Sequence, residues 1–126
     1  MAKDATTVRQ FKLFKKECDY WIKELGLQGW QVHYSHKDDE NKELRAWISF
    51  NKLADRQATI SLSKDWNPED PTDKIIQKCA FHEVLELLFR RFTVLAEYRC
   101  TTFDEIEEEK HNIIRTLENA VFDKLR

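Results

Sequence analysis

The sequence predicts an α+β fold with an N-terminal helix, a three-stranded antiparallel sheet, a long central helix and a C-terminal helix. Apolar residues recur every three or four positions near the N-terminus, alternate with polar residues between positions 30 and 63, and return to helical spacing after position 71. The chain has 126 residues, of which 41% are apolar. This size and hydrophobic content predict one domain spanning residues 1–126.

The first predicted helix covers Thr7 to Leu25. Its apolar residues share one stripe: Val8, Phe11, Phe14, Cys18, Trp21, Ile22 and Leu25. Thr7 is a suitable N-cap, because its hydroxyl can accept a hydrogen bond from a free amide of the first turn. Gly26 is a suitable stop, because glycine adopts the left-handed conformation that ends many helices.

Three segments then alternate between apolar and polar residues, as half-buried strands require. They cover residues 30–35, 44–50 and 58–63. The connections around 38–41 and 51–56 are short and polar, and short connections favour antiparallel neighbours. We therefore expect a meander in which each strand pairs with the next one along the chain.

A second helix is predicted from about Pro71 to the region of Tyr98. The sequence Asp70-Pro71-Thr72-Asp73 combines a cap, a first-turn proline and early carboxylates, which is typical of a helix start. Apolar residues spread around most of this helix, so we expect it to be central and covered on several sides. A last helix begins at Phe103 and continues to the C-terminus.

Composition narrows the classes of function. The 21 Lys and Arg nearly balance the 23 Asp and Glu, and the net charge of −2 argues against a dedicated nucleic-acid binder. The three cysteines are far apart and form no CxxC pair, which predicts free thiols in a reducing compartment. The N-terminus lacks the apolar run of a signal peptide and no segment is apolar enough to span a membrane. A cytoplasmic location is expected.

A histidine and two glutamates interrupt the apolar central helix. His82 and Glu86 are four residues apart and share a helix face, which is the spacing by which one helix offers two ligands to a zinc ion. In the HExxH motif of zinc peptidases, the glutamate beside the first histidine accepts a proton from metal-bound water. The segment here reads HExxE, so Glu83 is the candidate catalytic base and His82 and Glu86 are candidate metal ligands.

A solvated polar stripe is the competing interpretation of these three residues. Such a stripe should continue along the same face of the helix. Positions 75, 79 and 89 on or near that face hold Ile75, Cys79 and Phe89 instead. We therefore expect the polar trio to be enclosed, which favours a site.

A third ligand has to come from another element, and the last helix offers Glu107, Glu108 and His111 within one turn. The acidic run is also explained by the dipole at a helix start. His111 precedes an apolar pair that should face the central helix, so the candidate metal set is His82, Glu86 and His111, with Glu107 and Glu108 as alternatives. His33 and His36 are expected at the surface.

These motifs resemble the small zincin-like metallopeptidases encoded by bacteriophages and, more distantly, SprT-like and other minimal zincins. The resemblance rests on Trp30-x-Val32, the segment His82 to Leu88 and the segment His111 to Asn119, in that order. It implies a zincin-like fold and a Zn²⁺ cofactor, with zinc bound by His82 and His111 and with Glu83 as the general base. It also implies a protein or peptide substrate and, for a phage protein, the host cytoplasm as location.

Glu86 is the departure from this family pattern, because the better-known minimal zincins have histidine there. A carboxylate donor leaves the metal less electrophilic, so bound water should be harder to ionise. Two functions therefore follow from the sequence. The first is a zinc metallopeptidase, and the alternative is a non-catalytic phage accessory protein that uses the same scaffold to bind a host protein.

Overall fold

The computed structural model describes residues 5–40, 43–51, 56–98 and 100–125. Within them, the elements follow in the order α1 (Val8–Glu24), β1 (Gln31–His36), β2 (Ala46–Phe50), β3 (Gln57–Leu62), α2 (Asp73–Glu97) and α3 (Phe103–Leu117). A π-helical turn at Glu118–Phe122 and a 3-10 turn at Asp123–Leu125 continue α3. The α+β class and the order of the elements are confirmed.

The ends of α1 follow from its sequence. The Thr7 hydroxyl accepts a hydrogen bond from the Gln10 amide at 3.1 Å, and the Gln10 side chain accepts one from the Thr7 amide at 3.1 Å. This reciprocal pair satisfies two amides that the helix itself leaves free. At the other end Gly26 has a φ of +70°, which is unfavourable for residues with a side chain. Both predicted helix ends are confirmed.

The predicted antiparallel meander is wrong. The strand order is β1-β3-β2, so β3 is the central strand. It pairs with β1 in parallel, with Tyr34 opposite Ile60, and with β2 antiparallel, with Ile48 also opposite Ile60. The sheet is therefore mixed.

Strand alternation could not predict this order, because it shows which side chains share a face and not which strands are neighbours. β1 and β2 lie on opposite sides of β3, so their separation is two strand spacings, roughly 10 Å. The connection between them, residues 37–45, is long enough to cover this distance, because a few extended residues suffice. β3 has no charged residue, and Ala58, Ile60 and Leu62 are buried, which suits a central strand. The two predicted polar connections lie partly outside the described residues, at 41–42 and 52–55.

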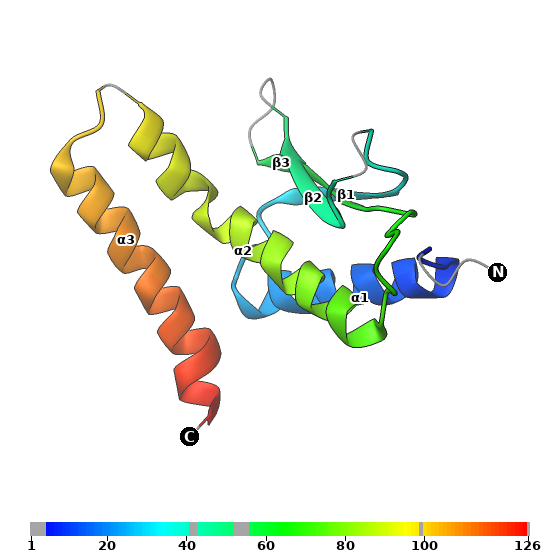
Figure 1. The fold of residues 1–126 in the computed structure, drawn as a ribbon. Coiled ribbons are helices and arrows are strands. Elements are labelled where there is room, and N and C mark those ends of the chain that lie inside the picture. Colours follow the sequence, from blue (N-terminus) through cyan, green and yellow to red (C-terminus); the bar gives the residue numbers. More distant parts are fainter. Residues whose placement is uncertain (1–4, 41–42, 52–55, 99, 126) are drawn as a thin grey trace.

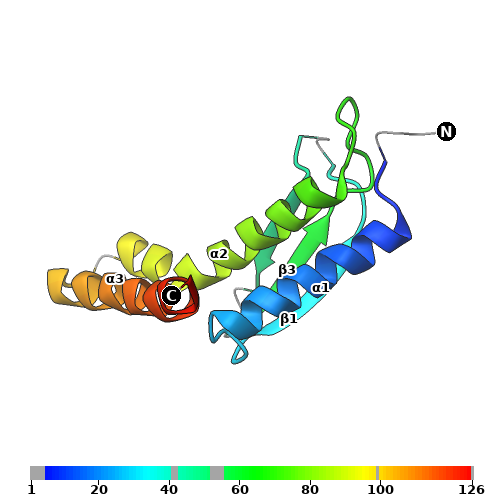
Figure 2. The same ribbon diagram turned by 90° about the horizontal axis from the view of Figure 1, so that it is seen from below.

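The domain has two main layers, because α1 and α2 lie side by side against one face of the sheet (Figures 1 and 2). The core between them is formed by these fully or almost fully buried side chains: Phe14, Cys18, Ala58, Ile60, Leu62, Ile76, Ala80, Val84 and Leu87. By contrast, α3 packs beside the second half of α2 and extends beyond the sheet (Figures 1 and 2).

Polar contacts fix the start of α2 to the start of α1. Arg9 donates two hydrogen bonds to the Asp73 carboxylate, at 3.0 and 3.1 Å. The side-chain amide of the buried Gln10 donates a hydrogen bond to the backbone carbonyl of Pro71 at 2.9 Å. α2 therefore has a defined position against α1 and the sheet. Within the described residues, no helix has the length and apolar content needed to cross a membrane.

Candidate functional site

The motif helix α2 is held on two sides. Its first turn is capped by Thr72, whose hydroxyl accepts a hydrogen bond from the Ile75 amide at 3.3 Å. On one side, Phe81 packs against Trp21 of α1 with ring centroids 4.6 Å apart, and Gln77 donates to Glu17 at 3.2 Å. On another side α2 contacts β2. The predicted central position of this helix is confirmed.

The candidate ligands on α2 lie together. His82 Nε2 is 3.8 Å from Glu86 Oε2, as the four-residue spacing predicts. The prediction that the trio is enclosed is wrong for these two residues, because the side chains of His82 and Glu86 are 69% and 54% exposed. The apolar neighbours on this face do not enclose the pair, because Ile75 and Cys79 are only half-buried and Phe89 is 39% exposed.

Glu83 has a different environment from its two partners. The residue is only 6% exposed. Burial raises the pKa of its carboxyl from 4.5 to about 7; the neighbouring His82 lowers it and Glu86 raises it, both to a smaller extent. A carboxyl that titrates near neutral pH is suited to accept and release a proton. The sequence suggested a base at this position, but only the packing explains its pKa.

Glu83 and His82 border a cavity of about 660 Å³ between α2 and the start of β2. Its lining is Glu43, Leu44, Arg45, Ala46, Ile75, Lys78, Cys79, Phe81, His82, Glu83 and Leu85. Burial also raises the pKa of the Cys79 thiol, so this thiol is neutral at neutral pH. β2 is an edge strand of the sheet. The cavity therefore combines a protonatable acid, an exposed histidine and a strand edge.

The candidate ligands on α3 are not brought to this cavity. His111 Nε2 lies 3.8 Å from Glu107 Oε2, and both residues belong to α3. Lys110 also pairs with Glu107, at 2.9 Å, and this contact lowers the pKa of the Glu107 carboxyl. Glu108 is exposed. In the part of the chain that the structure describes, no three His, Cys, Asp or Glu side chains form a group that could hold a metal ion.

The residues on α2 fit zinc as two ligands of a larger set. Tetrahedral zinc with bonds of about 2.0–2.1 Å holds its donors ~3.3 Å apart. The 3.8 Å between His82 Nε2 and Glu86 Oε2 is close to that value, and small rotations of two exposed side chains would close the difference. A third protein donor is not assembled among the described residues.

Other predictions from the sequence had mixed outcomes. His33 is exposed as expected, but His36 is half-buried, stacks on Phe11 with ring centroids 4.8 Å apart and hydrogen-bonds the Thr6 hydroxyl at 2.7 Å. The cysteines Cys18, Cys79 and Cys100 are free, as expected. The sequence did not indicate a second cavity near Arg56 and Arg90, because its residues come from five separate segments.

Comparisons with known proteins add no further assignment. No known protein family, no curated protein and no solved structure matches this chain. The site is therefore described by its geometry alone: a two-donor pair beside a buried acid, at a cavity under a sheet edge.

Proposed function

We propose that this protein is a zinc-dependent metallopeptidase with its active site on α2. The observation that carries the proposal is Glu83, a buried carboxyl with a pKa near neutral, directly beside His82 at a cavity that a sheet edge borders. Perturbed acids in a cavity are more frequent at catalytic sites than elsewhere.

In this proposal, His82 and Glu86 are two metal ligands and His111 is the third. Zinc, when bound, would polarise a peptide carbonyl and supply a water of lowered pKa. Glu83 would accept on its carboxylate the proton that the attacking water releases, and would pass it to the amine that leaves. Because His111 lies with Glu107 on α3 and outside the cavity, this donor set requires α3 to change its position against α2.

The substrate class proposed is an extended polypeptide. β2 is an edge strand, and its first residue, Ala46, lines the cavity with His82 and with Arg45, which precedes the strand. A peptide that pairs with such an edge is recognised through its backbone, and many side chains are then tolerated. This fits a protein or peptide substrate of broad sequence.

A second candidate function is a binding module without catalysis, which acts on a host protein. The observation that favours it is the exposed apolar surface of α3 and the turns after it. Phe103 is 73% exposed, Phe122 is 54% exposed and Ile114 is 43% exposed. Several large apolar side chains in solvent are typical of a surface that meets a partner.

Elemental analysis of the purified protein, followed by cleavage of an unfolded casein substrate with zinc supplied, tests the proposal. We expect bound zinc in the wild type. Glu83→Gln should keep the zinc and lose hydrolysis, because an amide cannot accept a proton from water. Activity that persists in Glu83→Gln would move the base elsewhere.

Glu86→His separates the two candidate functions. A neutral imidazole should lower the pKa of metal-bound water relative to the carboxylate, so a peptidase should become faster. A binding module should show changed metal affinity and no cleavage. Zinc content is measured in the variant, because imidazole and carboxylate place their donor atoms differently. A variant with a full equivalent of zinc and no activity would contradict the peptidase proposal.

A further inference from the structure

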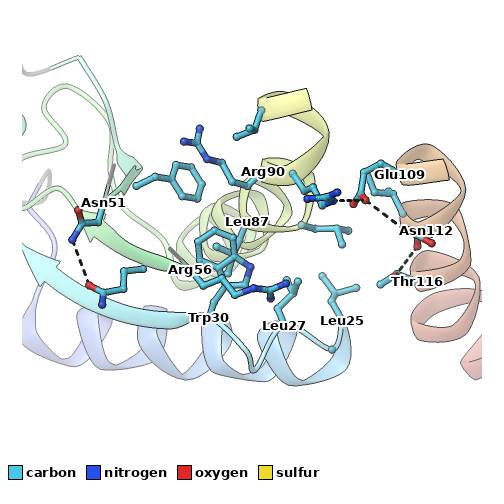
Figure 3. A pocket seen from close by; sticks show the side chains of 17 residues that line it. Leu25, Leu27, Trp30, Asn51, Arg56, Leu87, Arg90, Glu109, Asn112 and Thr116 are labelled. Atoms are coloured by element: carbon cyan, nitrogen blue, oxygen red, sulfur yellow. Dashed lines mark hydrogen bonds and ion pairs between the residues drawn. The ribbon is translucent and has the colours of Figure 1, made fainter. Parts of the chain in front are cut away.

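A second cavity, of about 550 Å³, lies where the end of α1, the strand ends, α2 and α3 meet (Figure 3). Its size is within the range of sites for small organic ligands. The apolar part of the lining includes Leu25, Leu27, Trp30, Phe50, Leu87 and Val94. In Figure 3, Trp30 and Arg56 lie together on the α1 side, across from Glu109 and Asn112 of α3.

The polar part of the lining has an excess of positive charge. Three arginines line the cavity, Arg56, Arg90 and Arg91, against one carboxylate, Glu109. Arg91 Nε is 3.3 Å from Glu109 Oε2, and the Glu109 side chain is only 13% exposed, so these two charges offset each other. Within the described residues, no carboxylate pairs with Arg56 or Arg90. Two positive charges thus remain available for a ligand.

Arg56 has an unfavourable backbone conformation. Its φ of +57° is in the left-handed region, which an arginine adopts at an energetic cost. A Cβ atom at position 29 would lie 3.2 Å from Arg56 Nη1, so the absence of a side chain at Gly29 provides space for this guanidinium. Strained residues of this kind are concentrated at functional sites.

Arg90 is ordered by an aromatic side chain. Its guanidinium carbon lies 4.3 Å from the centroid of the Phe50 ring, and Trp30 meets that ring edge-on with centroids 5.7 Å apart. The stack keeps the Arg90 charge next to apolar rings. Cationic and aromatic groups therefore line the same cavity.

We propose that this cavity binds a small organic anion that has an apolar body. The anionic group contacts Arg56, with Arg90 adding positive potential, and the apolar body packs against Trp30 and the neighbouring leucines. A purely apolar ligand would leave the two guanidinium groups without an anionic partner. A bare inorganic ion would make no contact with the apolar side chains of the lining. This site contains no proposed metal ligand, and it exists in the position of α3 that the structure shows, because Glu109 and Asn112 of α3 line it.

Titration with the fluorescent anion anilinonaphthalene sulfonate tests the site, with decanoate as a non-fluorescent competitor. We expect the metal-free protein to show saturable binding at one site, displacement by decanoate and weaker binding as NaCl rises. The uncharged dye N-phenylnaphthylamine should bind much more weakly. Equal binding of the charged and uncharged dyes would overturn the proposal, as would the absence of saturable binding at millimolar concentration.

Arg56→Gly is the decisive variant, because it deletes the guanidinium and relieves the positive φ, so thermal stability should be kept. It should weaken binding of both anions about tenfold, the effect of losing one charge-assisted hydrogen bond. Arg90→Gln should weaken binding in the same direction. The matched control Lys74→Gln removes one charge from an exposed position on α2 and should leave binding unchanged. Unchanged affinity in Arg56→Gly with an intact fold would overturn the site.

Discussion

Two histidine–glutamate pairs in this protein have the same spacing and the same geometry but different surroundings. His82–Glu86 on α2 and His111–Glu107 on α3 both have an Nε2–Oε2 distance of 3.8 Å, and all four side chains are at least one-third exposed. The α2 pair lies beside the buried Glu83 and a cavity. In the α3 pair, the Glu107 carboxylate also forms an ion pair with Lys110, which offsets its charge.

Helical spacing produces a His–Glu pair wherever the two residue types occur four positions apart, whereas a functional site also needs tertiary contacts around the pair. α2 packs against α1 and the sheet, so a residue next to the pair can be buried and its pKa can be shifted. α3 packs mainly against α2 and leaves most of its surface in water. The following predictions test this difference between the two helices.

The largest difference is expected in the cost of truncating an apolar side chain. Leu87 on α2 is 1% exposed, so Leu87→Ala should destabilise the protein by about 3 kcal/mol through lost burial and a cavity. Ile114 on α3 is 43% exposed, and Ile114→Ala should cost below ~1 kcal/mol. Urea unfolding of both variants measures this. Equal costs would mean that α3 is covered in solution by something other than α2.

Metal affinity tests whether the two histidines, His82 and His111, bind the same zinc ion. On the peptidase proposal, His82→Ala should weaken zinc binding by about a hundredfold, the equivalent of ~2.7 kcal/mol. His111→Ala should weaken it similarly if His111 is the third donor. His33→Ala, at an exposed strand position, is the control and should have no effect. Zinc affinity that depends on His82 and not on His111 would assign the third donor to another residue.

Glu83 and Glu107 should contribute to the pH dependence of stability with opposite signs. Because the pKa of folded Glu83 is raised to about 7, the folded state binds its proton more tightly than the unfolded state. The stabilisation by this proton is complete below pH 4.5 and is lost as pH rises through 7. Since the carboxyl borders an open cavity, we expect a loss of ~1–2 kcal/mol after screening by solvent.

Glu83→Gln should remove that loss, because the amide stays neutral, and its melting temperature should exceed that of the wild type at pH 8 but not at pH 4. Glu107→Gln is the matched control. The pKa of Glu107 is lowered by Lys110, so its stabilising contribution is present above pH 4.5 and is lost as pH falls. A rise in stability at pH 8 in the Glu107 variant would contradict the comparison.

The smallest effects are expected at the helix caps. Thr102 and Glu105 form a reciprocal capping pair at the start of α3, with hydrogen bonds of 3.1 and 3.2 Å, so Thr102→Ala should cost ~1 kcal/mol. Thr72 makes a single bond of 3.3 Å to the Ile75 amide, and Thr72→Ala should cost ~0.5 kcal/mol. Thermal unfolding followed by far-ultraviolet circular dichroism compares them. The reverse order would mean that packing, not capping, fixes the start of α3.

The helices, the strand segments and the His82–Glu86 pair could be predicted from local sequence patterns. Helical spacing identified α1 and α2, and Thr7 and Gly26 set the ends of α1 because caps and left-handed glycines act within a few residues. The four-residue distance from His82 to Glu86 required no knowledge of the fold.

The strand order and the different environments of neighbouring residues depend on tertiary packing and could not be predicted from local patterns. Pairing of β1 with β3 joins segments far apart in the chain, and alternation does not encode such neighbours. Glu83 is buried while His82 is exposed because β2 and α1 cover one part of α2 and leave the next part in water. His111 belongs to a helix whose position depends on packing against the second half of α2, so its distance from His82 could not follow from sequence spacing.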